Sequence, residues 1–85
     1  MSCSELRGRI RESVALLEGY RGYSNMVDEA ITSLLFIDDC VAEPTPRKME
    51  ESRLLISKLV EEISPYAAYV PALVATLNDV AKWFE

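Results

Sequence analysis

Two proline-containing breaks divide this chain of 85 residues, and they limit what it can fold into more than any other feature. One break lies at Glu43–Pro46, and the other spans Ser64–Pro71, with a further proline at position 65. Proline interrupts a helix, but it suits the first helical position after a Ser or Thr cap. We therefore expect one helix to begin at Pro46 and another segment to begin at position 65. Pro71 either kinks that last segment or begins its helix.

The segment before residue 19 has the spacing of an amphipathic helix. Ser2 followed by Glu5 matches a capping box, in which each side chain accepts a hydrogen bond from a free amide of the first turn. Apolar residues then recur every three or four positions, which places them on one helix face. We expect this helix to end near Glu18 or Gly19, because a second glycine follows closely at position 22.

The same periodicity continues through the rest of the chain. A second helix is expected from Ser24 or Asn25, either of which is suited to cap it, up to the break at Glu43. A third helix is expected from Pro46 to about Ile63. The predicted inward positions of the four segments are Leu6, Ile10, Val14 and Leu17; Val27, Ala30, Leu34, Ile37 and Val41; Met49, Ile56, Leu59 and Ile63; and Tyr66, Val70, Leu73, Leu77, Val80 and Phe84.

These elements define the expected fold class. No run of residues alternates between polar and apolar positions as a strand does. Short connections between successive helices favour antiparallel neighbours. We therefore predict an all-α protein, a small antiparallel bundle of three to four helices, with residues 1–85 forming a single domain.

Charge and hydropathy narrow the function classes. The chain carries a net charge of −5, and 49% of its residues are hydrophobic, which is too apolar for a disordered chain. Residues 26–45 contain five acidic and no basic side chains, so binding to a nucleic-acid backbone is unlikely on charge grounds. The longest apolar run is too short to cross a bilayer, and no signal-peptide pattern stands at the start. The sequence thus predicts a cytoplasmic protein without a membrane partner.

The residues that usually support catalysis or metal binding are sparse. There is no histidine, and the two cysteines, Cys3 and Cys40, lack the spacing of a zinc site. They form either one disulfide or two free thiols, and free thiols fit a cytoplasmic protein better. Without histidine, no hydroxyl or thiol has an obvious general base. We therefore expect no cofactor, no metal and no catalytic residue.

Consecutive acidic pairs are a further feature of the chain. Neighbouring side chains on a helix point about 100° apart, so such pairs do not converge on one metal ion. We interpret them as solvated surface, and we expect Asn replacements in the first pair to leave folding nearly unchanged. The pairs are Asp38-Asp39, Glu50-Glu51 and Glu61-Glu62.

Three arginines lie in the first helix. Arg7 and Arg11 share a face, whereas Arg9 lies nearly opposite, and the four-residue spacing allows Glu5 to pair with Arg9. The segment 6–10, Leu-Arg-Gly-Arg-Ile, with apolar residues 14–17 behind it, resembles the opening helix of the small all-helical chorismate mutases.

That family surrounds a dicarboxylate substrate with arginines and a lysine from several helices. The resemblance implies an alternative function for this chain, a small enzyme that binds an anionic metabolite at a helical dimer interface. The third helix departs from the family, because its Arg-Glu pair is absent there. The anion-binding residues in this alternative are Arg7, Arg11, Arg21 and Arg53.

The segment 19–23, Gly-Tyr-Arg-Gly-Tyr, mixes aromatic and basic side chains with glycine. Single-stranded nucleic-acid binders use such residues, which gives a second alternative, a nucleic-acid accessory factor. The interpretation we favour is a turn whose tyrosines lie over one end of the bundle.

The last segment has more apolar surface than one bundle stripe requires. This surplus is either buried inside the bundle or forms an interface, and we favour an interface with aromatic anchors. The sequence thus favours a non-enzymatic protein–protein interaction module, a small regulatory or accessory subunit, with a homodimer as the simplest version. The predicted interaction surface comprises Phe36, Tyr66, Tyr69, Val74, Trp83 and Phe84.

Overall fold

The computed structural model describes residues 2–85, and these residues form an all-α bundle without strands. Its helices are α1 (Cys3–Glu18), α2 (Asn25–Ala42), α3 (Pro46–Ile63) and α4 (Pro71–Trp83). A 3₁₀ helix, η1 (Ser64–Tyr69), connects α3 to α4. The predicted fold class is therefore confirmed, and so are the two breaks.

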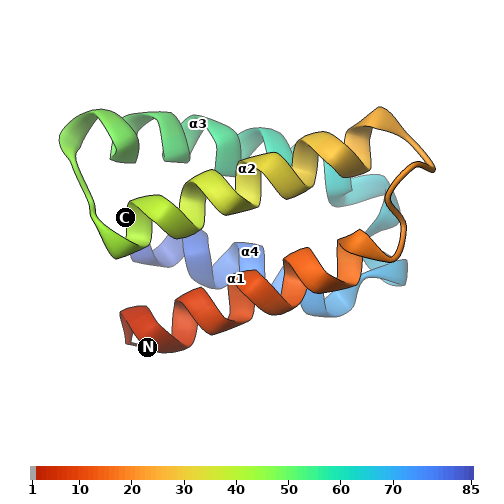
Figure 1. Ribbon diagram of the computed structural model, residues 1–85, viewed down its shortest axis with the longest axis horizontal. Coiled ribbons are helices and arrows are strands. Elements are labelled where there is room, and N and C mark those ends of the chain that lie inside the picture. Colours follow the sequence, from red (N-terminus) through yellow and green to blue (C-terminus); the bar gives the residue numbers. More distant parts are fainter. Residues whose placement is uncertain (1) are drawn as a thin grey trace.

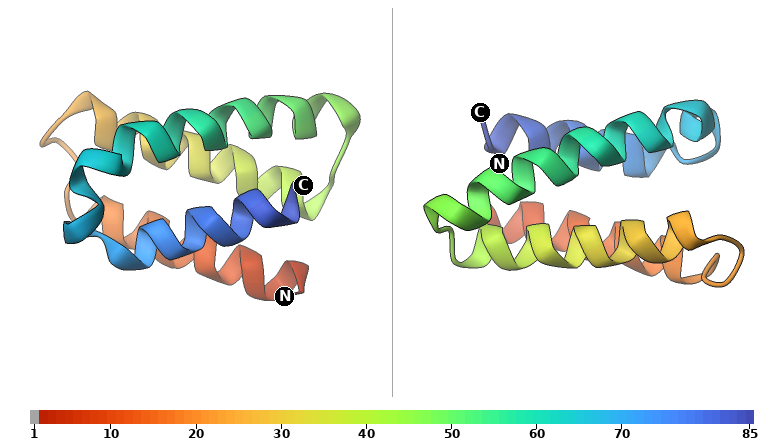
Figure 2. Two further views of the ribbon diagram at one scale, coloured as in Figure 1. Left: turned by 180° about the vertical axis from the view of Figure 1, so that it is seen from behind. Right: turned by 90° about the horizontal axis from the view of Figure 1, so that it is seen from above.

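The helices run antiparallel to their neighbours and form a ring of four (Figure 1). Helix α1 packs against α2 and α4, and α3 packs against the same two helices. Both ends of the chain lie at one end of the bundle, together with the α2–α3 connection, as both figures show (Figure 2). The α1–α2 loop and η1 lie together at the opposite end. The up-and-down order of the helices thus gives the bundle two ends that carry different connections.

Side-chain caps explain where two of the helices begin. The Ser2 hydroxyl accepts a hydrogen bond from the Glu5 amide at 3.1 Å. The Thr45 hydroxyl accepts one from the Lys48 amide at 3.2 Å. Ser24 holds the cap position of α2, but its side chain makes no capping bond. Ser24 therefore occupies the predicted cap position of α2, but it does not form the hydrogen bond by which a cap stabilises a helix.

The prolines begin helices rather than bending them. Pro46 is the first residue of α3, and Pro71 is the first residue of α4. Val70 has a φ of −133° and a ψ of 58°, so the chain leaves helical geometry before Pro71. This conformation agrees with the steric clash that excludes the α region for a residue preceding proline. Pro71 therefore resolves the earlier alternative in favour of a helix start.

The core is built from the apolar stripes of all four helices. Most predicted inward positions are buried, but Val27, Met49 and Val70 are only half-buried. Tyr66 is half exposed on η1, because the 3₁₀ helix breaks the register that would have placed it inside. The buried apolar residues are Leu6, Ile10, Val14, Leu17, Ala30, Ile31, Leu34, Ile37, Cys40, Val41, Ile56, Leu59, Ile63, Leu73, Leu77, Val80 and Phe84.

Replacing either Leu73 or Leu77 with Asp should unfold the domain. Both side chains are buried in α4, where an unpaired carboxylate loses its hydration, and we expect a loss of at least about 3 kcal/mol. Circular dichroism during a thermal melt measures this loss. Leu54→Asp is the control, because Leu54 is 69% exposed and should melt close to the wild type. A cooperative, unshifted melt for Leu73→Asp would contradict the assigned core.

Thr45→Ala should destabilise the protein by about 1 kcal/mol, since it removes the side-chain hydrogen bond that caps the Lys48 amide in the first turn of α3. Ser24→Ala is the matched control, because Ser24 makes no capping bond. Chemical denaturation of both variants measures the difference. Equal losses would argue against the Thr45 cap.

Candidate functional site

A buried carboxylate joins α1 to α2. The side chain of Asp38 is only 10% exposed, and it accepts hydrogen bonds from Arg7 Nε at 3.0 Å and Arg7 Nη2 at 3.3 Å. Arg11 Nε lies 3.5 Å from Asp38 Oδ2. The expectation of a solvated surface is therefore wrong for Asp38. Residue 38 shares a helix face with the buried Leu34 and Val41, and this face packs against α1.

The second carboxylate of the pair does lie on the surface. Asp39 is 62% exposed, and its Oδ2 lies 3.1 Å from Lys48 Nζ. This hydrogen bond raises the pKa of Lys48 above its ordinary value of 10.5. While Asp39 is charged, the contribution of the pair to stability is therefore complete below pH 10.5 and is lost as the pH rises through the higher folded pKa of Lys48. At neutral pH it is constant.

The bond to Asp38 likewise raises the pKa of Arg7, with the charge of Asp38 as the next cause. Arg7 is therefore a cation wherever the protein is folded. Its guanidinium is already committed to Asp38 through two of its nitrogens.

Arg9 joins α1 to α4 through an ion pair with Asp79. Glu5, which the four-residue spacing places within reach of Arg9, forms no ion pair with it among residues 2–85. Both Arg9 and Asp79 are about one-third exposed, so their helices shield the pair in part. A contact between helices is possible here because α1 and α4 are neighbours in the ring.

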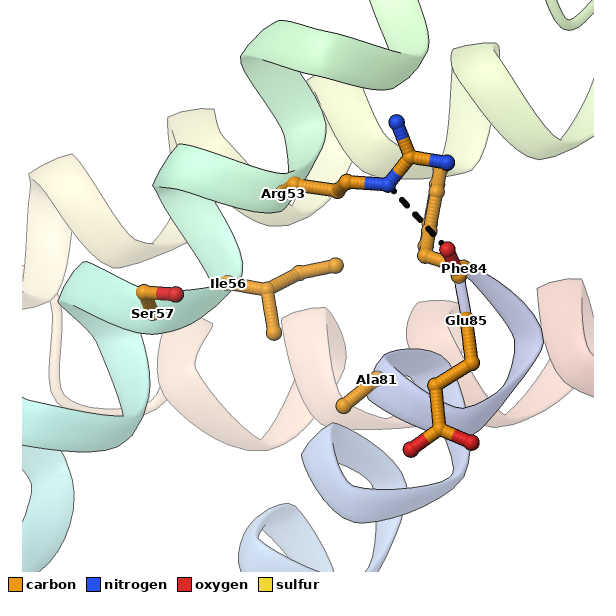
Figure 3. A pocket seen from close by; sticks show the side chains of 6 residues that line it. All are labelled: Arg53, Ile56, Ser57, Ala81, Phe84 and Glu85. Atoms are coloured by element: carbon orange, nitrogen blue, oxygen red, sulfur yellow. Dashed lines mark hydrogen bonds between the residues drawn. The ribbon is translucent and has the colours of Figure 1, made fainter.

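The other two candidate anion-binding arginines lie elsewhere. Arg53 Nε donates a hydrogen bond to the Phe84 carbonyl at 3.1 Å, and this bond holds the last turn of α4 against α3 (Figure 3). Arg21 Nε, in the α1–α2 loop, lies 3.7 Å from Asp28 Oδ1. The arginines proposed for one anion site thus lie at three separate places, and only Arg7 and Arg11 meet.

The predicted interaction surface also divides. The Phe84 side chain is 3% exposed and belongs to the core, so its assignment to a surface is wrong. Its ring packs edge-on against Trp83 with centroids 4.9 Å apart, and Trp83 is half-buried. Phe36 and Val74 are half-buried as well. Only Tyr66 and Tyr69 are well exposed, and both lie on η1.

These two tyrosines belong to a hollow at the end of the bundle that carries the α1–α2 loop and η1. All four tyrosines of the chain line it, two from each connection. The hollow has a volume of about 550 Å³, and we call it the tyrosine hollow. Its lining residues are Leu17, Tyr20, Tyr23, Ser24, Met26, Val27, Ile63, Tyr66, Tyr69, Val70 and Leu73.

The two connections explain why the tyrosines gather there. Gly22 has a φ of +93°, a left-handed conformation that glycine adopts without a steric penalty, and it turns the α1–α2 loop between Tyr20 and Tyr23. The rings of these two tyrosines are 6.2 Å apart and tilted by 59°. Their predicted position over the bundle end is confirmed. The sequence also marked Tyr66 and Tyr69, but the convergence of both pairs on one hollow was missed.

The lining of the tyrosine hollow is mostly apolar. Buried or half-buried aliphatic side chains form its floor, and no charged side chain lines it. Tyr23 and Tyr69 are 82% and 83% exposed, an unusual position for such large rings. A concave apolar surface with a few hydroxyl groups is typical of ligand and partner sites.

From residue 2 to residue 85, no three acidic or cysteine side chains gather closely enough to hold a metal ion. Cys3 is exposed, Cys40 is buried, and both are free thiols. Each helix within this range is too short or too polar to cross a bilayer. Comparison with protein-family models, curated proteins and solved structures gave no match.

Asp38→Asn should destabilise the protein by about 2 kcal/mol, because it leaves two arginines facing a neutral, partly buried amide. Asp39→Asn removes the same charge from an exposed position and should cost less than about 0.5 kcal/mol. Urea denaturation at pH 7 compares the two variants. Equal stability of the two variants would mean that the Asp38 pair contributes no more than a surface ion pair.

Proposed function

We propose that this chain is a non-enzymatic protein–protein interaction module, a small accessory or regulatory subunit that docks a partner at the tyrosine hollow. The observation that carries this proposal is the gathering of all four tyrosines around one apolar concavity. Tyrosine is enriched at interfaces because it offers a large apolar area and one hydroxyl at a low cost in side-chain entropy. Four such residues at one end are more than the packing of the bundle requires.

The volume of the hollow supports a partner that inserts side chains. About 550 Å³ lies within the range of sites that enclose a small ligand or a cluster of anchoring residues. The apolar floor supplies the driving force when water leaves, and the tyrosine hydroxyls offer hydrogen bonds at the rim. The partner is either a second copy of this chain or a different protein.

The alternative of an enzyme for an anionic metabolite has less support. Arg7 and Arg11 meet at Asp38, which neutralises one of their two charges. Arg21 and Arg53 lie apart from them and are engaged by Asp28 and by the Phe84 carbonyl. We also favour a cytoplasmic location, which two free thiols, one of them exposed, support.

A peptide selection tests the docking proposal. A random peptide library displayed on phage is selected on the immobilised protein, and enriched peptides are then assayed against Tyr23→Ser/Tyr69→Ser. Both tyrosines are highly exposed, so this variant should keep its fold while losing at least about tenfold in affinity. The control, Leu35→Ser/Leu54→Ser, removes exposed leucines outside the hollow and should bind as the wild type does.

Two results would count against the proposal. Peptides that bind the tyrosine variant as well as the wild type would place recognition elsewhere, and a selection without enrichment would leave the hollow without a peptide ligand. Light scattering over a dilution series tests self-association in parallel. A dimer that dissociates in Tyr23→Ser/Tyr69→Ser would support the version in which the partner is a second copy.

A further inference from the structure

Acidic residues lie next to the lining residues of the tyrosine hollow along the chain, although none of them lines it. Five acidic residues lie within two positions of a lining residue along the chain, against a single base, Arg21. Arg21 itself faces the Asp28 carboxylate at 3.7 Å. The acidic residues are Glu18, Asp28, Glu29, Glu61 and Glu62.

The basic residues gather toward the other end of the bundle. Of the nine lysines and arginines, only Arg21 and Lys58 lie near the hollow, and Lys58 Nζ is 3.8 Å from Glu62 Oε1. The others lie within the first nine residues of α1, the first half of α3 and the last turn of α4. The hollow is thus an apolar surface within a negative field.

We propose that the occupant of the tyrosine hollow is a basic amphipathic segment of another protein, with apolar side chains in the hollow and lysines or arginines beside them. This inference rests on the docking function proposed above and adds the chemistry of the partner. Three of these carboxylates, on Glu18, Glu29 and Glu61, have no ion-pair partner within residues 2–85, and their charge attracts a cationic partner and repels an anionic one. The faces of the exposed tyrosine rings add a further attraction for lysine and arginine side chains.

The same charges argue against a second copy in this position. The chain carries a net charge of −5, and acidic residues outnumber basic ones in both halves of the bundle. A two-fold dimer through the hollow would bring two identical acidic rims together, because a two-fold interface repeats the same patch on both subunits. Like charges in that position oppose association.

Fluorescence anisotropy with designed peptides tests the inference. Three labelled amphipathic peptides share one leucine face and carry either lysine, glutamine or glutamate on the other. At 150 mM NaCl the lysine peptide should bind at least about tenfold more tightly than the glutamate peptide, and the difference should shrink at 500 mM NaCl. The glutamine peptide should lie between them.

Matched variants locate the effect on the protein. Glu18→Gln/Glu29→Gln removes two exposed rim charges and should weaken the lysine peptide at least about threefold. Glu50→Gln/Glu51→Gln removes the same charge from the first half of α3, at the end of the bundle opposite the hollow. This variant should weaken binding of the lysine peptide less. Tyr23→Ser/Tyr69→Ser should reduce binding of all three peptides.

The results separate this inference from the docking function. Peptides that depend on the tyrosines but bind equally with lysine or glutamate would overturn the basic partner while leaving docking intact. If Tyr23→Ser/Tyr69→Ser binds the lysine peptide as tightly as the wild type does, the assignment of the binding site to the hollow is overturned. If the wild type is a dimer and Tyr23→Ser/Tyr69→Ser is a monomer, the occupant is a second copy, and the inference is overturned.

Discussion

The apolar core shared by four antiparallel helices is the constraint on which the rest of the structure depends. Each helix buries one stripe against two neighbours, and the short connections make successive helices reverse direction. That reversal sends the α1–α2 loop and η1 to one end and the two chain ends to the other (Figure 1). The gathering of the tyrosines and of the acidic residues beside them follows from this arrangement, since they lie in or next to the segments that meet at the first of these ends.

Helix boundaries were largely predictable from the sequence, because local chemistry decides them. Pro46 defines the start of α3, and the Ser2 cap defines the start of α1. Both helix starts follow from backbone geometry within a few residues. The conformation at Pro71 was left open because its neighbours allow either outcome. Contacts between helices could not be predicted in the same way. Asp38 and Arg9 find their partners only after the helices have taken their relative rotation, which no local pattern encodes.

The candidate site shows the same division between local and long-range information. Tyr66 and Tyr69 were recognised as apolar surplus, and the tyrosine-bearing turn was expected at a bundle end, but their meeting depends on topology. The antiparallel order, combined with short connections, contains that information, since loops one and three of such a bundle share an end. Phe84 was misassigned because it satisfies the core periodicity of α4 as well as it satisfies the profile of an aromatic anchor. Burial is a property of the assembled bundle.

The central claim is that the tyrosine end, rather than any other face, receives a basic partner segment. The most direct measurement is a titration of the ¹⁵N-labelled protein with the lysine-bearing amphipathic peptide, followed by amide chemical-shift mapping. We expect the perturbed amides to cluster in residues 17–29 and 61–73, on the two connections and the helix turns beside them. Shifts centred on the first half of α1 or on the α2–α3 connection, with the tyrosine end unchanged, would contradict it.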